Sequence, residues 1–122
     1  MTKILLVDYS CHPFSLQLAQ SFSKKSLETF YAFSKNVNMT GNFYQNFKNP
    51  KLKIISVKTK KFYKYNFLKR RNSEIEFGDK IIEILEEKKI NKIILANVPI
   101  DPLYRIIKYC KKNNIKNYFW VQ

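Results

Sequence analysis

The fold is decided by the stretch Lys3-Ile4-Leu5-Leu6-Val7-Asp8, which runs directly into Tyr9-Ser10-Cys11-His12-Pro13. An unbroken apolar run without alternation is typical of a strand that is buried on both faces, as in a parallel sheet covered by helices. Such strands present their functional groups at their C-terminal ends. The polar groups that follow this run, Ser10 and His12 above all, are therefore candidate site residues.

A second run with the same pattern lies late in the chain. Lys92-Ile93-Ile94-Leu95-Ala96 is followed by Asn97-Val98-Pro99-Ile100-Asp101. We expect this strand to lie beside the first one, so that the two exit loops share one crevice. The sequence thus predicts that Ser10, His12, Asn97 and Asp101 come together.

Helical and extended patterns alternate between and around these two runs. We predict helices from about Pro13 to Lys25, from Ser73 to about Lys89 and from Asp101 onward, and further strands over 28–34, 52–57 and 116–121, with a long polar connection over 35–51. This alternation predicts an α/β fold, a three-layer Rossmann-like sandwich with a five-stranded, mostly parallel sheet in the order 3-2-1-4-5. The switch point of that order lies between the first and fourth strands.

Local signals give the expected helix starts and faces. Phe14, Leu18 and Phe22 recur at four-residue steps and, with Ala19 adjoining them, predict the apolar stripe of the first helix. Ser73 and Glu76 have the spacing of a capping box, and the sequence leaves open whether 66–72 belongs to the same helix or precedes it. Asp101 before Pro102 is typical of an N-cap.

Composition limits the class of protein. A chain of 122 residues is long enough for one domain with a real core. With two glycines, neither a dinucleotide fingerprint nor a P-loop can be written. Cys11, Cys110 and His12 do not form a zinc-binding spacing, so we expect no metal and no cofactor. The sequence shows neither a signal peptide nor an apolar run long enough to span a membrane, and we expect a cytoplasmic protein with reduced thiols.

The charge is strongly positive, with 23 Lys and Arg against 9 Asp and Glu and a formal net charge of +14. This balance indicates either an anionic partner or a biased composition that decorates every solvated face. The stretch 58–71 is the most basic part of the chain and is interleaved with aromatic residues. Such a pattern suits a nucleic-acid surface, but it also suits a solvated loop, which we favour.

Four segments together resemble a known family: KILLVDYSCHPFSLQL (Lys3 to Leu18), NFLKRRNSEIEFG (Asn66 to Gly78), ANVPIDP (Ala96 to Pro102) and YFWVQ (Tyr118 to Gln122). They are similar to the N-terminal domain of glycosyltransferases of the two-domain GT-B architecture. The group includes many bacterial polysaccharide and lipid-linked-sugar transferases. The chain departs from the family at Cys11 and Ser26, where the family usually has glycine.

The resemblance implies an enzyme that transfers a sugar from a nucleotide-sugar donor. This chain would be its acceptor-binding half, residues 1–122. The donor-binding C-terminal domain would be a missing partner, so the isolated chain should be inactive. The expected acceptor is a polysaccharide or a lipid-linked sugar, and contact with the anionic inner face of the membrane is a further expectation.

The resemblance also suggests roles for particular residues. His12 would be the catalytic base. Ser10, Asn97, Asp101, Arg71 and Lys64 would bind the substrate, and the basic residues among them would meet a lipid diphosphate. The alternative is a small basic α/β module that binds nucleic acid or an anionic surface, with nucleic acid the less favoured partner.

Overall fold

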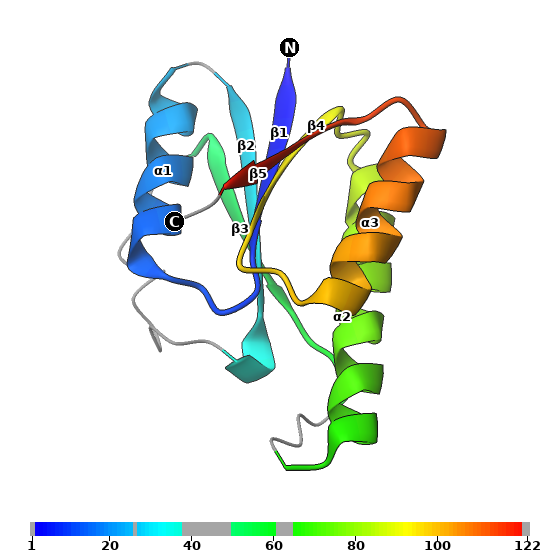
Figure 1. The fold of residues 1–122 in the computed structure, drawn as a ribbon. Helices are drawn as coiled ribbons and strands as arrows, with labels where there is room; N and C mark the ends of the chain where they lie inside the picture. The colour runs from blue at the N-terminus through cyan, green and yellow to red at the C-terminus, as the bar shows by residue number, and fades with distance from the viewer. Residues whose placement is uncertain (1, 26, 38–49, 61–64, 121–122) are drawn as a thin grey trace.

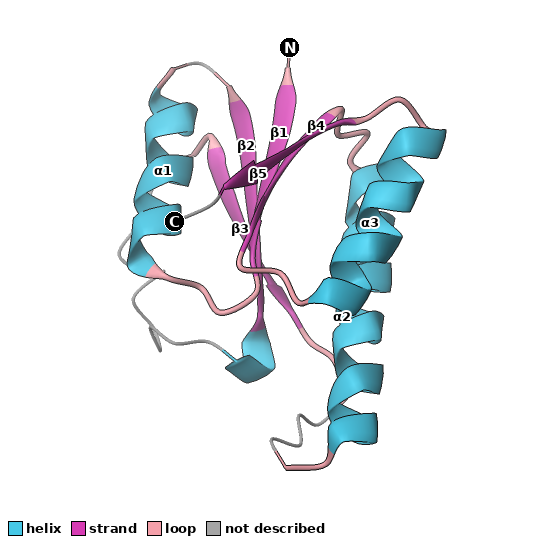
Figure 2. Cartoon of the chain, in the orientation of Figure 1, coloured by secondary structure: helices cyan, strands magenta, loops and turns pink. Residues whose placement is uncertain are grey.

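The computed structural model describes residues 2–25, 27–37, 50–60 and 65–120 and contains a five-stranded sheet (Figures 1 and 2). Its strands are β1 (Lys3–Asp8), β2 (Glu28–Ser34), β3 (Leu52–Val57), β4 (Lys92–Ala96) and β5 (Lys116–Trp120). They lie in the order β3-β2-β1-β4-β5, and every neighbouring pair is parallel. The strand order predicted from the sequence is therefore confirmed.

Helices cover both faces of the sheet. α1 (Pro13–Lys24) packs on one face, and α2 (Phe67–Glu87) and α3 (Ile100–Lys112) pack together on the other (Figure 1). A short 3-10 helix, η1 (Lys35–Val37), follows β2. On the α1 face the core contains Leu6, Leu16 and Tyr31, whereas Phe77 and Ile106 belong to the core on the other face.

β1 and β4 are direct neighbours in the centre of the sheet. Their register pairs Asp8 with Ala96, so the chain leaves both strands at the same level. The exit residues Cys11 and Asn97 have positive φ values of 57° and 51°. Non-glycine residues rarely adopt this left-handed conformation and often do so where a site requires it. The predicted meeting of the two exit loops is confirmed.

Two predicted helix caps are wrong, and the question whether 66–72 belongs to the second helix, which the sequence left open, is answered. α2 begins at Phe67, because the side chain of Asn66 accepts a hydrogen bond from the backbone N–H of Lys69 at 3.2 Å and caps the helix there. Ser73 lies inside α2, where its hydroxyl contacts that of Thr59 at 3.0 Å instead of capping a helix end. α3 begins at Ile100 with Pro99 as N-cap, and Asp101 lies in its first turn.

The predicted stripe of α1 is confirmed in part: Ala19 is buried, and Leu18 and Phe22 are partly buried and pack against the core. The buried residues of this helix are Ser15, Leu16, Ala19 and Ser23. Phe14, which was expected to be buried, is only partly covered and packs edge-on against Trp120, with ring centroids 5.0 Å apart. The helix is therefore rotated toward small residues, which allow it to approach the sheet closely.

Among the residues that the structure describes, no helix combines the length and the apolarity that are needed to cross a membrane.

Candidate functional site

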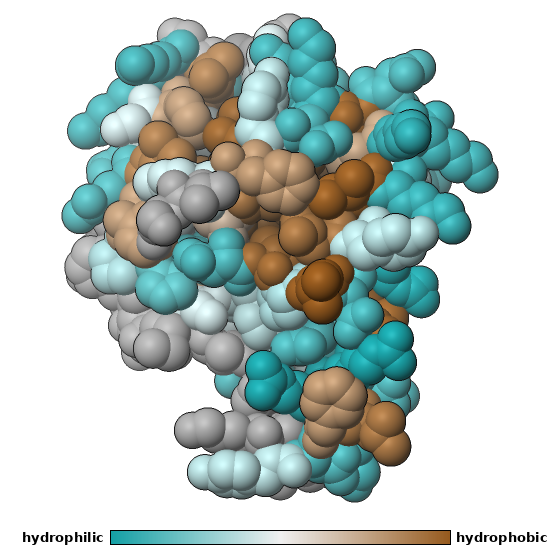
Figure 3. Space-filling view, viewed as in Figure 1, coloured by the Kyte–Doolittle hydropathy of each residue, from teal (hydrophilic) through white to brown (hydrophobic). Residues whose placement is uncertain are grey.

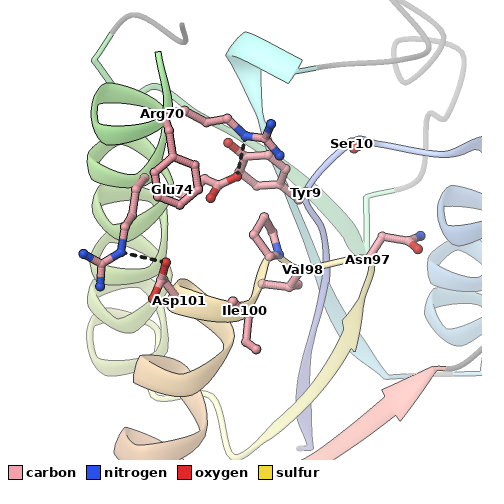
Figure 4. Close-up of a pocket in the computed structure, with 11 residues that line it drawn as sticks. Tyr9, Ser10, Arg70, Glu74, Asn97, Val98, Ile100 and Asp101 are labelled. Carbon is pink, nitrogen blue, oxygen red and sulfur yellow. Dashed lines mark hydrogen bonds and ion pairs between the residues drawn. The ribbon is translucent and has the colours of Figure 1, made fainter. Parts of the chain in front are cut away.

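A pocket of about 580 Å³ lies at the carboxyl edge of the sheet. It is an open pocket bounded by the loops after β1 and β4 and by the N-terminal parts of α2 and α3 (Figure 4). Its polar lining includes Ser10, Arg70, Arg71, Glu74, Asn97 and Asp101. This is the switch point of the strand order, where open α/β sheets usually bind their ligands.

The structure brings most of the predicted site residues to this pocket. Ser10, Asn97, Asp101 and Arg71 all line it. His12 does not line it but lies beside it, with its Nδ1 atom 3.4 Å from Nδ2 of Asn97. Lys64, the remaining predicted binding residue, falls outside the described part of the chain.

Two arginine–carboxylate pairs form the wall that α2 and α3 contribute. Nε of Arg71 lies 3.1 Å from Oδ2 of Asp101 and links the two helices, and Nε of Arg70 lies 3.4 Å from Oε2 of Glu74 (Figure 4). Asp101 was predicted as an N-cap, but its carboxylate holds Arg71 in place instead. Because each guanidinium already has a carboxylate neighbour, this wall offers polar hydrogen-bonding groups of both charges.

Tyr9 forms the back of the pocket. It is buried, and its ring packs edge-on against that of Phe77, with centroids 4.9 Å apart. Burial, together with the nearby carboxylate of Glu74, raises the pKa of Tyr9 to about 12. Its hydroxyl group therefore keeps its proton at neutral pH and can donate a hydrogen bond.

Asp8 organises the loop after β1, and sequence reasoning gave it no role. Its carboxylate is fully buried and accepts hydrogen bonds from the backbone N–H groups of Ser10 at 3.2 Å and His12 at 3.0 Å. It also accepts one from the Ser15 hydroxyl at 2.7 Å. In the sequence, the only sign of this role is a carboxylate at the end of an apolar strand. That pattern does not reveal which groups donate hydrogen bonds to the carboxylate.

Asp8 also orients His12. Both carboxylate oxygens lie 3.2 Å from Nδ1 of the imidazole. Because a carboxylate only accepts hydrogen bonds, Nδ1 carries the proton and donates a hydrogen bond to Asp8. A protonated Nδ1 cannot accept a hydrogen bond from Asn97, and the amide of Asn97 stays available to a ligand. Nε2 of His12 is then the free acceptor of a side chain that is 33% exposed. This is the arrangement of a histidine positioned to take a proton.

A buried polar chain continues behind Asp8 toward α1 and β2. The hydroxyl of Ser15 donates a hydrogen bond to Asp8. The same hydroxyl lies 2.6 Å from that of Tyr31. Burial raises the pKa of Tyr31 strongly, so this phenol also stays protonated and supplies the next donor. The chain holds Asp8 from the side opposite to the pocket.

Cys11 and Ser26 are the two positions at which the sequence departs from the glycosyltransferase pattern that it resembles. Cys11 adopts the left-handed φ of 57° that glycine takes freely, and its N–H donates to the Asp8 carbonyl oxygen at 3.2 Å. The loop therefore has a glycine-like backbone despite its cysteine. Ser26 lies outside the described residues.

Metal ligands do not gather in the part of the chain that the structure describes: it contains no group of three or more His, Cys, Asp or Glu residues suited to hold an ion. Cys11 and Cys110 are both buried, and burial raises the pKa of the Cys110 thiol to about 11. Cys110 is thus an unreactive core residue.

No family model matches the sequence, and no curated protein matches it. Two crystal structures of the C-terminal domain of the PF1911 hydrogenase from Pyrococcus furiosus are similar in fold. One has a TM-score of 0.72 at 10% identity and the other 0.69 at 12% identity, and each alignment covers 98% of this chain and 91% of that domain. A UDP-galactose 4-epimerase aligns with a TM-score of 0.43 at 8% identity, over 78% of this chain and 37% of its own, which is too low to carry an argument. The two matches to the hydrogenase domain show an α/β fold of the Rossmann-like kind and nothing beyond the fold.

Proposed function

We propose that this chain is the acceptor-binding domain of a glycosyltransferase, and that the pocket at the switch point holds a sugar or a lipid-linked sugar. The observation that carries the proposal is the convergence of Ser10, Asn97, Asp101 and Arg71 on one pocket beside the paired His12 and Asp8. The sequence resemblance supplies the reaction type, and the geometry supports a ligand rich in hydroxyl groups.

The lining suits a hydroxylated ligand because it offers both donors and acceptors. The phenol of Tyr9 and the amide of Asn97 can donate hydrogen bonds, and the carboxylates of Glu74 and Asp101 can accept them. In the complete enzyme, Nε2 of His12 would remove the proton from the acceptor hydroxyl as it attacks the donor sugar. Asp8 would act as a positioning residue that fixes the tautomer of His12.

The alternative is a basic module that binds nucleic acid. One observation favours it: Tyr65 and Phe67 are 94% and 75% exposed within a lysine-rich and arginine-rich stretch, and aromatic side chains of this kind can stack on bases. Against it, the guanidinium groups of Arg70 and Arg71 lie beside carboxylates, which reduces the positive potential that phosphates would meet. The acceptor-binding function therefore fits the site better.

Binding to the pocket is tested by NMR titration of the 122-residue chain with methyl glycosides and sugar 1-phosphates. We expect amide shifts at Ser10, Asn97 and Val98, and binding weakened about tenfold by Asn97→Gly, since one hydrogen bond to the ligand is lost. Glycine accepts the φ of 51° at this position, so the backbone is retained while the amide is removed. The matched control is Asn91→Ala, an exposed asparagine at the opposite edge of the sheet.

The proposal is contradicted if none of these ligands shifts the signals of the pocket. It is also contradicted if single-stranded RNA binds more tightly than every sugar ligand and shifts only the signals of the lysine-rich and arginine-rich stretch, which would favour the alternative.

A further inference from the structure

Three aromatic side chains gather at the same edge of the sheet as the pocket, on the side of α1. The imidazole of His12 stacks on the ring of Phe14, with centroids 5.3 Å apart and planes inclined by 23°. Phe14 in turn packs edge-on against Trp120, with centroids 5.0 Å apart. We call these three residues the aromatic cluster. They come from the loop after β1, the first turn of α1 and the end of β5, so only the tertiary structure brings them together.

The strand register places the aromatic cluster at the level of the site. Asp8 pairs with Ala96, and Ala96 pairs with Trp120 on the next strand, so the three residues form one row across the sheet. Contacts with α1 show that the two ends of this row share a face: Ser15 donates a hydrogen bond to Asp8, and Phe14 packs on Trp120. Trp120 therefore lies two strands away from the carboxylate that positions His12, and at the same height.

The aromatic cluster is separate from the packed interior. Phe14 and Trp120 are only partly buried, and neither belongs to the two apolar cores that the described residues form. Figure 3 shows apolar surface over β5, between α1 and α3, with hydrophilic surface around it. Aromatic side chains that stay partly open beside polar groups are typical of ligand-binding surfaces.

Asn97 connects the aromatic cluster with the pocket. It lines the pocket, and its Nδ2 atom lies 3.4 Å from Nδ1 of His12. Figure 4 shows its amide pointing away from the wall of Arg70 and Glu74 and toward α1. A ligand that fills the pocket and extends past Asn97 therefore reaches the aromatic cluster next.

We propose that the aromatic cluster is a second sugar subsite, and that the acceptor is an oligosaccharide with one unit in the pocket and the next unit against Phe14 and Trp120. A sugar ring has faces of C–H groups that pack on aromatic rings, while its hydroxyl groups point outward to polar partners. The aromatic cluster and the amide of Asn97 offer both kinds of contact side by side. The inference rests on the proposed function and deepens it, because it sets the length of the acceptor.

Trp120 is the single tryptophan of the chain, so its fluorescence reports on this subsite without a label. The test compares the methyl glycosides of glucose, galactose and N-acetylglucosamine with the disaccharides cellobiose, lactose and chitobiose. We expect at least one disaccharide to bind about tenfold more tightly than its methyl glycosides and to shift the Trp120 emission to shorter wavelength. The methyl glycosides should shift the NMR signals of Ser10 and Val98 and leave the emission unchanged.

Two variants remove the stacking surface. Phe14→Leu keeps an apolar side chain and the fluorescent Trp120, whereas Trp120→Leu is followed by NMR. Each should weaken disaccharide binding by about fivefold to tenfold and leave the binding of methyl glycosides unchanged. The matched control is Phe119→Leu, which should change neither: Phe119 is 52% exposed on the same strand, and its side chain points to the opposite face of the sheet. Urea unfolding of each variant shows that the chain is folded in every comparison.

Three results would overturn the inference: disaccharides that bind no more tightly than the methyl glycosides, an equal loss of both kinds of ligand in Phe14→Leu, or an emission shift caused by uridine 5′-monophosphate and by none of the sugars. If the methyl glycosides still shift the signals of the pocket, these results leave the proposed function standing. If no sugar shifts any signal, the proposed function fails and the inference fails with it.

Discussion

Asp8 shows how one residue can fix a site without touching its ligand. Its carboxylate is completely buried and would be costly there without partners. Three hydrogen bonds to the carboxylate offset this cost, donated by the backbone N–H groups of Ser10 and His12 and by the hydroxyl of Ser15. The same carboxylate then receives Nδ1–H of His12. Folding the loop and orienting the imidazole are therefore one event.

We expect Asp8→Asn to lower the free energy of unfolding by about 2–3 kcal/mol, because the amide presents a donor to groups that are themselves donors. The measurement is urea denaturation at neutral pH. NMR of the His12 ring should show at the same time that the proton is no longer held at Nδ1. A simple loss of stability with the tautomer unchanged would contradict the positioning role.

The matched control for this substitution is Asp79→Asn. Asp79 is an exposed acid on α2 that lies 3.7 Å from Arg105, and its replacement should change stability by less than about 0.5 kcal/mol.

At the scale of elements, the wall of the pocket depends on how closely α2 approaches α3. Gly78 makes that approach possible: a Cβ atom placed there would lie 2.8 Å from both Cα and Cβ of Pro102. Pro102 belongs to the first turn of α3, next to Asp101, which holds Arg71 across the same crossing. The absence of a side chain at Gly78 thus allows the short distance between Arg71 and Asp101, which both line the pocket.

We expect Gly78→Ala to lower the free energy of unfolding by about 1–2 kcal/mol. Overpacking typically costs about 1–3 kcal/mol, and the better helix propensity of alanine returns at most about 1 kcal/mol. Glu83→Ala, on an exposed position of α2, is the control and should have little effect. A more stable Gly78→Ala protein would mean that α3 moves away without cost, and binding at the pocket would then be the property to measure.

At the scale of the whole molecule, the three buried groups Tyr9, Tyr31 and Cys110 couple stability to alkaline pH. Burial is the main cause that raises the pKa of Tyr9 from 10.0 to about 12 and that of Cys110 from 9.0 to about 11, and it raises the pKa of Tyr31 strongly. The unfolded chain ionises first, so the stabilisation is complete below about pH 9 and is lost as the pH rises toward the folded values. The sheet core and the α3 packing should therefore weaken together in base.

Urea denaturation in reducing buffer between neutral pH and about pH 11 measures this effect. We expect Cys110 to account for roughly 2 kcal/mol of the loss at about pH 11, so Cys110→Ala should show a correspondingly shallower decline. The stabilities of both proteins at neutral pH give the reference. If both proteins lose the same free energy of unfolding over this pH range, folding does not raise the pKa of Cys110 and the prediction is wrong.

The sequence predicted the order of the strands and the place of the site because both follow from local patterns. Two unbroken apolar runs mark β1 and β4 as central strands, and the alternation of elements restricts their connection to one common topology. Ser10, Asn97, Asp101 and Arg71 were predicted from those runs and from the family resemblance. The transfer of a sugar stays a prediction.

The long-range partners of the site were set by the tertiary structure alone. Asn66 caps α2, whereas the hydroxyl of Ser73 contacts that of Thr59, a residue from the segment after β3 that the local capping pattern could not indicate. Arg71 and Asp101 stand 30 residues apart, and their pairing required the close crossing of α2 and α3. Periodicity and capping act over a few residues, whereas hydrogen bonds and packing join whichever groups the fold brings together; this is why the strands could be predicted and the partners of their polar side chains could not.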